Sequence, residues 1–241
     1  SSITLSIEDW LWVHFMLIKD DFSSDDPVYE RYSLKDFQNT IISYGSSRFN
    51  NYYLQVLLLG GLYELAVQYA FSINEIDAVH LAIALAHYKL LRVSSYRGNA
   101  EDDLITLDNG QREINFAKIL GNYTKSFKYS DPRIAVEYLI LIALVDSKEQ
   151  IELSHEALRE LVLETKEFTI LLGKINRDGT RIPGIIEERQ SLLYLNDEKE
   201  FLHKITEQAA RRADEDGRIY DSLLLYQLSE EYDIVIFIVN K

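Results

Sequence analysis

The chain has 241 residues and is strongly acidic: 25 lysines and arginines stand against 39 aspartates and glutamates, which gives a formal net charge of −14 at pH 7. The average field of such a chain repels a phosphate backbone, so direct nucleic-acid binding would need a local basic patch. The absence of cysteine excludes disulfides, thiolate metal ligands and a cysteine nucleophile.

No basic patch is visible in the sequence. The densest basic spot is Arg211-Arg212, and it is followed at once by the acidic run Asp214-Glu215-Asp216. We therefore expect no direct contact with nucleic acid.

The apolar runs of the chain are short. The longest cover residues 138–145 and 234–239, against the roughly 18 residues that a membrane-spanning helix needs, so we expect no transmembrane segment. The first residues have neither a basic start nor an apolar signal core, and the run at 234–239 stops near the last residue. We expect the chain to be a piece of a longer protein whose further helices pack on residues 234–239.

Helical periodicity and capping residues divide most of the chain into helices. The helices predicted in chain order cover residues 6–19, 33–45, 50–59, 62–71, 74–91, 111–127, 132–144, 147–165, 185–195, 196–214, 219–231 and 234–239. The polar segments between them predict loops at about 20–32, 94–110 and 173–184.

The first two helices begin with the spacing of a capping box, Ser6 with Asp9 and Ser33 with Asp36. Gly45 is expected to end the second helix. The face of the first helix predicted to be buried consists of Trp10, Val13, Met16 and Ile18.

Gly60 and Gly61 separate two apolar helices. Two glycines can take the left-handed conformation that ends a helix and turns the chain, so we predict a tight antiparallel helical hairpin here. The next helix begins at Asn74 as its N-cap and has two apolar stripes, one through Val79 and one through Leu81. We expect neighbours to cover both stripes, as in the interior helix of a stacked array.

The second half of the chain restarts at Asp131 and Pro132. Asp131 can cap a helix, and proline at the first helical position loses no hydrogen bond. The following helix starts at either Ser147 or Ser154, and its periodicity fits an end at about residue 165 or a continuation to Leu172.

Two further choices concern the C-terminal part. Asn196 is the predicted cap of the helix that follows it. The β-branched run 234–239 would suit a strand by propensity, but a lone strand has no partner, so we predict a helix.

These elements predict an all-α fold, an elongated α-helical solenoid of stacked antiparallel hairpins in a single module over residues 1–241. No repeat of fixed period is visible, so the predicted hairpins have diverged in sequence.

The histidines do not form a metal site in the sequence. His80 and His87 share a helix face, but seven residues at about 1.5 Å each put them about 10 Å apart, too far to share an ion. His155-Glu156 begins like a zinc-protease motif, yet Arg159 stands where the second histidine belongs. We expect a helix surface there, with Glu156 and Arg159 as neighbours.

The glycine-containing motifs are equally incomplete. The Asp-Gly sequences at Gly179 and Gly217 lack the acidic ligands of a calcium loop, and Gly60-Gly61 is not followed by the Lys and Ser or Thr of a phosphate-binding loop. We therefore expect no catalytic, cofactor-binding or metal-binding residue and no cofactor, and we expect Gly60, Gly61, Asn74, Leu81, Asp131 and Pro132 to have structural roles.

Three blocks of sequence, residues 53–69, 77–91 and 116–139, resemble the nucleoporin-interacting component family and occur in the same order as in that family. Its members are the inner-ring scaffold nucleoporins of the nuclear pore complex. The amino-acid sequence of the three blocks resembles that of fungal members most. The resemblance implies that the chain has the fold of an ancestral coatomer element, of which it would form the trunk and crown part. It further implies a structural role at the nuclear envelope, in pore assembly and nucleocytoplasmic transport of protein and mRNA, through binding other scaffold and linker nucleoporins. It assigns no partner-binding residue in this chain.

Two other classes of protein remain as alternatives. A cage subunit of a vesicle coat has the same architecture. The physical properties of the sequence alone do not distinguish such a subunit from a nucleoporin. A helical hydrolase or metalloenzyme is the other class, against which the failed motifs argue.

Overall fold

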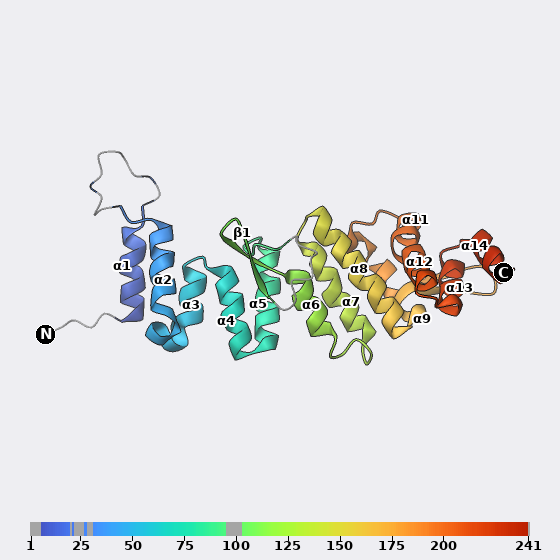
Figure 1. The fold of residues 1–241 in the computed structure, drawn as a ribbon, viewed down its shortest axis with the longest axis horizontal. Helices are drawn as coiled ribbons and strands as arrows, with labels where there is room; N and C mark the ends of the chain where they lie inside the picture. Colours follow the sequence, from blue (N-terminus) through green and yellow to red (C-terminus); the bar gives the residue numbers. More distant parts are fainter. Residues whose placement is uncertain (1–5, 20, 22–26, 28–30, 95–102, 241) are drawn as a thin grey trace. The chain divides into compact units, whose positions relative to one another are not determined.

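The computed structural model describes residues 6–19, 21, 27, 31–94 and 103–240. Most of these residues are helical, and the strands of the described residues form two short hairpins (Figure 1). The predicted all-α fold class is thereby confirmed. The chain divides into two compact units, one of residues 1–92 with 110–112 and the other of residues 93–109 with 113–241, and each is described by itself.

The first unit consists of consecutive helices. Its elements are α1 (Ile7–Leu17), α2 (Leu34–Phe49), a 3₁₀ turn (Asn50–Tyr52), α3 (Tyr53–Leu59), α4 (Tyr63–Ile73) and α5 (Glu75–His87). From α2 onward each helix packs on the next, as a stack of helical hairpins requires. One cluster of buried side chains fills the space between α1 and α4: Leu11, Phe37, Ile41, Phe49, Val56, Leu57 and Ala66.

Both predicted capping boxes are present. The side chain of Ser6 accepts from the N–H of Asp9, and that of Ser33 accepts from the N–H of Asp36, with each aspartate binding back to the cap. The predicted end at Gly45 is only partly right. Gly45 has φ 64° and ψ −173°, which interrupts the helix, but α2 resumes and continues to Phe49.

The buried face predicted for the first helix is wrong at two positions. Leu11 is buried, whereas Val13 is 38% exposed and Met16 is 68% exposed. Apolar residues occur on every side of α1, with Trp10 to Val13 forming a continuous run. Periodicity therefore could not identify which side faces the core.

The Gly60-Gly61 turn joins α3 to α4. Gly61 has φ +73°, its N–H donates to the carbonyl of Leu58 at 3.1 Å, and the N–H of Leu62 donates to the carbonyl of Leu57 at 2.9 Å. This pair of hydrogen bonds is the Schellman motif, which satisfies the last carbonyls of a helix and reverses the chain. The turn sets α4 against α3.

Asn74 is the N-cap of α5, and its side chain accepts from the N–H of Asp77 at 3.1 Å. The side of α5 that is buried carries mainly small residues: Ala78, Val79, Ala82, Leu85 and Ala86. Leu81 is only half-buried and Ile76 is 56% exposed, so the expectation that both stripes are covered is wrong at these two positions. The alanine face allows α5 to approach α4 closely, and the bulkier stripe lies outside that contact.

The second unit contains shorter and more varied elements. Residues 110–112, in the turn before β2 and at its start, are grouped with the first unit. The elements from residue 105 onward are β1 (Ile105–Asp108), β2 (Gln111–Ile114), α6 (Phe116–Thr124), α7 (Pro132–Ile140), a 3₁₀ turn (Leu141–Leu144), α8 (Lys148–Thr165), α9 (Phe168–Leu172), β3 (Gly173–Ile175), β4 (Arg181–Pro183), α10 (Ile185–Glu188), a 3₁₀ turn (Gln190–Leu193), α11 (Glu198–Phe201), a π-helical segment (Leu202–Glu207), α12 (Gln208–Glu215), α13 (Ile219–Leu228) and α14 (Tyr232–Val239). Helix α8 packs on α6, α7 and α12 and so occupies the centre of this unit.

Two predicted loops contain β-hairpins instead. Strand β1, in the loop predicted at 94–110, pairs with β2 just after that loop, across a turn in which Asn109 and Gly110 both have positive φ, 49° and 78°. That is the two-residue turn typical of hairpins. The helix predicted from Gln111 therefore begins at Phe116, capped by Asn115. Residues 95–102 of this loop lie outside the described residues, as does most of the loop predicted at 20–32.

The loop predicted at 173–184 is a hairpin as well. Strands β3 and β4 pair antiparallel, with Gly173 opposite Pro183 and Ile175 opposite Arg181. Two close approaches of the backbone explain the glycines at both ends. A Cβ on Gly173 would lie 2.1 Å from the carbonyl oxygen of Ile182, and a Cβ on Gly184 would lie 2.5 Å from that of Leu171.

In the second unit, the predicted helix starts at Asp131 and Ser147 are confirmed, whereas the predicted cap at Asn196 is wrong. The side chain of Asp131 accepts from the N–H of Ile134 with Pro132 at the first turn, and Ser147, not Ser154, caps α8. Asp197, not Asn196, caps α11. The N–H and side-chain amide of Asn196 instead bind the carboxylate of Glu200.

The structure also answers two questions that the sequence left open, where α8 ends and whether the terminal apolar run is a helix or a strand. Helix α8 ends at Thr165, because Lys166 takes the left-handed conformation, and α9 follows as a separate helix. The terminal run is helical, α14, as predicted.

Candidate functional site

The histidines singled out in the sequence have separate surroundings. His80 and His87 are both exposed, and Nδ1 of His80 lies 2.7 Å from the carbonyl oxygen of Ile76 one turn back. Within the described part of the chain, no group of three or more potential ligands has a geometry that could hold a metal ion.

His155 is buried, so the expected helix surface is wrong at this position. Its side chain is 5% exposed, and Nε2 lies 2.9 Å from the carbonyl oxygen of Leu193 in the 3₁₀ turn that covers α8. Burial lowers the pKa of His155, which keeps the ring neutral. Arg159 pairs with Glu152 at 3.1 Å and not with Glu156, and its Nη1 donates to the carbonyl oxygen of Lys204 in the π-helical segment at 3.0 Å.

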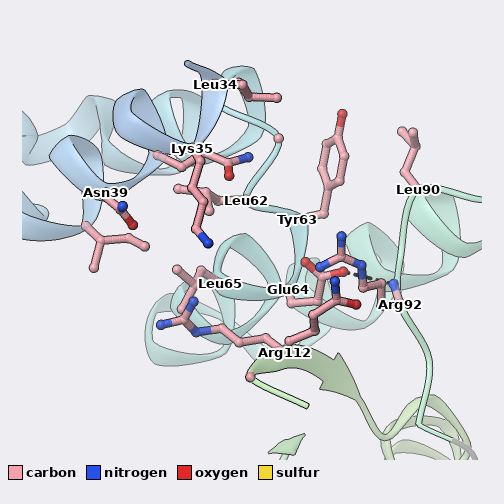
Figure 2. Close-up of a pocket in the computed structure, with 15 residues that line it drawn as sticks. Leu34, Lys35, Asn39, Leu62, Tyr63, Glu64, Leu65, Leu90, Arg92 and Arg112 are labelled. Atoms are coloured by element: carbon pink, nitrogen blue, oxygen red, sulfur yellow. Dashed lines mark hydrogen bonds between the residues drawn. The ribbon is translucent and has the colours of Figure 1, made fainter. Parts of the chain in front are cut away.

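A cavity of about 630 Å³ opens on the first unit (Figure 2). Its wall is built from the first half of α2, the Gly61 turn, the first turn of α4, the segment after α5, and the start of β2. This volume lies within the range of small-ligand and peptide pockets. We refer to this cavity as the α2–α4 groove.

Three cations from distant parts of the sequence surround the α2–α4 groove. Figure 2 shows Lys35 reaching in from α2, Arg92 from the segment after α5, and Arg112 from β2. None of the three forms an ion pair with a carboxylate among the residues that the structure describes. In the second unit, by contrast, the following arginines are paired with carboxylates: Arg159, Arg181, Arg189, Arg211, Arg212 and Arg218.

The sequence shows no local basic patch, whereas the fold brings three cations together at the α2–α4 groove. Arg211 and Arg212, the densest basic spot of the sequence, are neutralised by Glu207 and Asp216. Each of the groove cations stands apart from the other two in the sequence, and only folding brings them together. No local pattern of charge or spacing could have indicated them.

Two hydrogen bonds fix the walls of the groove. The backbone N–H of Arg92 donates to Oε1 of the buried Glu64 at 2.9 Å, which ties the segment after α5 to the first turn of α4. Nε2 of Gln38 donates to the carbonyl of Gly60 at 2.8 Å, which ties α2 to the turn between α3 and α4. A groove held this way is largely formed before anything binds.

The groove also offers apolar and uncharged polar surface. Leu34 and Leu90 are each 43% exposed at its rim, and Ile42 is 36% exposed. Asn39, which α2 carries (Figure 2), is exposed and presents an amide that can both donate and accept hydrogen bonds. The groove therefore combines positive charge, apolar anchoring surface and a group suited to a peptide backbone.

The residues given structural roles in the sequence do not converge on this groove. Gly61 lines it, and the preceding residue Gly60 lies close to Ile41. Asn74 and Leu81 belong to α5 in the first unit, and Asp131 and Pro132 begin α7 in the second. Their positions are those of caps, turns and packing contacts, and the groove has no catalytic arrangement among them.

Comparison with known proteins identifies relatives along the entire chain. A family model described as Nup93/Nic96 matches residues 1–241. Nucleoporin NIC96 of Saccharomyces cerevisiae is 68% identical over 240 residues, which cover 100% of this chain and 28% of that protein. Nuclear pore complex protein Nup93 of Danio rerio is 29% identical over 246 residues, which cover 97% of this chain and 28% of that protein. The chain thus spans less than a third of the length of these relatives.

A solved structure is also similar. The crystal structure of Chaetomium thermophilum Nic96 SOL aligns with a TM-score of 0.80 at 38% sequence identity, covering 98% of this chain and 35% of that chain. The described residues contain no helix with the length and apolarity that crossing a bilayer would require.

Proposed function

The chain belongs to the Nup93/Nic96 family, and on that basis we propose that it is part of a structural scaffold of the nuclear pore complex inner ring. The resemblance of residues 53–69, 77–91 and 116–139 to fungal members of this family is thereby confirmed. The proposed role is to support pore assembly, and with it the transport of protein and mRNA across the nuclear envelope.

The observation that carries the proposal is the extent of the match. Family similarity covers residues 1–241, and the fold of the Nic96 solenoid fragment from Chaetomium thermophilum covers 98% of the chain. Stacked helical hairpins suit a scaffold, because they bury a core with local contacts and leave long surfaces on which partners can bind. The partners in this proposal are other scaffold and linker nucleoporins, and the role requires no catalytic group or cofactor.

In this proposal, α14 contacts further helices of the same polypeptide. Ile236 is 59% exposed and Val239 is 68% exposed on this short apolar helix. Apolar side chains grouped in this way are normally covered in the functional protein. We propose that further helices of the longer polypeptide pack on α14 and extend the solenoid, so that residues 1–241 act as one part of it.

The experiment is to tag the full-length parent protein fluorescently in its own cells and to identify the proteins captured with it. The proposal expects a nuclear rim signal and recovery of nucleoporins in stoichiometric amounts. Cytoplasmic puncta with coat subunits in the captured material would instead identify a vesicle-coat protein and overturn the proposal.

A further inference from the structure

The α2–α4 groove has the properties of a peptide-binding site. We propose that it binds a short, extended, acidic segment of a partner protein, with aspartates or glutamates beside an apolar residue. This inference deepens the proposed scaffold role, since it names the chemistry of one partner, and it rests on that role only in requiring that the chain bind other proteins.

The charge of the groove sets the charge of the ligand. Lys35, Arg92 and Arg112 line it with one carboxylate, that of Glu64, which accepts the backbone N–H of Arg92. The groove is therefore net positive in a chain whose net charge is −14. Leaving like charges close together is unfavourable in the free protein, and an acidic ligand removes that repulsion.

The shape and apolar rim of the groove set the second property of the ligand. Leu34, Tyr63 and Leu90 line the groove, and in Figure 2 Tyr63 lies between the two leucines. Leucines that are 43% exposed gain by covering their apolar area, and this favours a ligand that carries an apolar side chain. A free anion such as phosphate would leave both leucines in water.

The backbone of an extended peptide also finds partners in the groove. Asn39 presents its amide, and the first turn of α4 has no side-chain cap: its cap position is Leu62, so the N–H groups of the first turn are not satisfied by a side chain. These donors add to the three cations in favouring carboxylates. The charge and the shape of the groove remain the main determinants of the ligand, and these N–H donors supplement them.

A protein segment fits these features better than a nucleic acid. Tight binding of a phosphate backbone relies on many basic contacts, whereas the groove has three cations and the rest of the chain is acidic. A phosphate backbone has no apolar group that could cover Leu34 and Leu90 at the rim. The geometry therefore selects an acidic peptide with an apolar anchor.

The test is selection from a phage-displayed library of random dodecapeptides on the immobilised 241-residue chain. The proposal expects enriched peptides to be rich in aspartate and glutamate and to contain leucine, isoleucine or phenylalanine. The affinity of an enriched peptide, measured by fluorescence anisotropy, is expected to fall as sodium chloride rises from about 50 mM to about 300 mM, because exposed charges are screened.

Two double variants locate the binding site. Lys35→Glu with Arg112→Glu is expected to weaken the enriched peptide by about tenfold, the combined effect of losing two exposed charge contacts and reversing their sign. Arg133→Glu with Lys148→Glu changes the net charge by the same amount on the second unit and is expected to leave the affinity unchanged within about twofold. Circular dichroism spectra establish that both variants remain folded.

Several results would overturn the inference. They are the absence of any enriched peptide, enrichment of neutral or basic peptides, and equal weakening by both double variants. Tighter binding of a short oligothymidylate than of the enriched peptide, lost in the Lys35→Glu and Arg112→Glu variant, would assign the groove to nucleic acid. Each of these results is independent of where the parent protein localises, so the scaffold role can stand when the groove inference fails.

Discussion

The backbone N–H of Arg92 donates to Oε1 of Glu64 across 28 positions of sequence at a distance of 2.9 Å. Glu64 is only 7% exposed, so its carboxylate depends on this bond for part of the hydration it loses on folding. The bond also holds the segment after α5 against the start of α4, which is one wall of the α2–α4 groove.

Replacing Glu64 tests this relationship. Glu64→Ala removes the acceptor and is expected to lower the free energy of unfolding by about 1 to 3 kcal/mol, the usual cost of losing a buried hydrogen bond to a charged group. Glu64→Gln retains an acceptor of similar shape and is expected to cost less. Urea denaturation measures both, and equal losses for the two variants would show that the hydrogen bond to Arg92 is unimportant.

The tight fit at Gly60 leads to a second prediction. A Cβ at this position would lie 2.6 Å from Cδ1 of the fully buried Ile41 and 3.2 Å from the carbonyl oxygen of Val56. Gly60→Ala is therefore expected to destabilise the chain by about 1 to 3 kcal/mol through overpacking, and Gly60→Val by more.

The matched control is Gly121, a helical glycine whose built Cβ has no atom within 4 Å apart from its chain neighbours and the backbone of its own helix. Gly121→Ala is expected to raise stability by about 0.5 to 1 kcal/mol, because alanine loses less backbone entropy on folding. The prediction concerns the difference in melting temperature between the two alanine variants. A drop of similar size in both would refute the packing argument.

Local signals in the sequence were sufficient to predict the structure of short segments whose conformation depends on one capping or turn residue. The capping boxes at Ser6 and Ser33, the Gly60-Gly61 turn and the helix start at Asp131 follow from hydrogen bonds within a few residues of each other. The β1–β2 hairpin was also within reach, because Asn109-Gly110 between Leu107 and Arg112 is the strongest short hairpin signal. The acidic residues near this turn favour a loop in the sequence and obscure that signal.

The groove and the buried side of α1 were beyond such signals. Lys35, Arg92 and Arg112 come together only through the packing of α2, α4 and β2. Trp10 and Met16 are both apolar and share one short helix, and which of them faces the core depends on where α2 packs. Contacts between distant segments decide both features, and a single sequence contains no record of those contacts.

The β3–β4 hairpin makes a third prediction possible. Gly173 has φ +98°, and a Cβ there would lie 2.1 Å from a backbone oxygen that cannot move aside without breaking the pairing with Pro183. Gly173→Ala is expected to destabilise the second unit by more than about 3 kcal/mol, since both backbone strain and a backbone clash result.

Gly179, in the turn of the same hairpin, separates these two effects. Its φ is +85°, but no atom lies within 4 Å of a built Cβ. Gly179→Ala is therefore expected to cost only the strain of a left-handed alanine, about 1 to 2 kcal/mol. Chemical denaturation followed by circular dichroism compares the two, and a Gly179→Ala variant as unstable as Gly173→Ala would be incompatible with the clash.

Capping provides a fourth prediction. The side chain of Asn74 accepts from the N–H of Asp77 at 3.1 Å at the start of α5. Asn74→Ala is expected to lower stability by about 1 kcal/mol, and Asn74→Asp is expected to restore most of it because aspartate caps equally well. Thermal denaturation in which the aspartate variant behaves like the alanine variant would remove the cap from the explanation.

The last prediction concerns pH and His155. Burial is the main cause that lowers its pKa in the folded chain, with smaller effects from Arg159 and Lys204, whereas the carbonyl of Leu193 and the carboxylate of Glu152 act in the opposite direction. The unfolded chain therefore binds a proton at this histidine more readily than the folded chain does. The stability that the neutral ring contributes is present above the ordinary histidine pKa of about 6.5 and is lost as pH falls from there towards the lower folded value.

His155→Gln isolates this contribution, since a glutamine amide can still donate to the carbonyl of Leu193 and does not titrate. Between about pH 7.5 and about pH 5.5, the free energy of unfolding of the unaltered chain is expected to fall more than that of the variant. Glu160 and Glu187, whose pKa values burial raises, are present in both proteins, so their contribution cancels in the difference. Urea denaturation across this range measures that difference, and a value that does not change with pH would show that His155 is not held neutral by its burial.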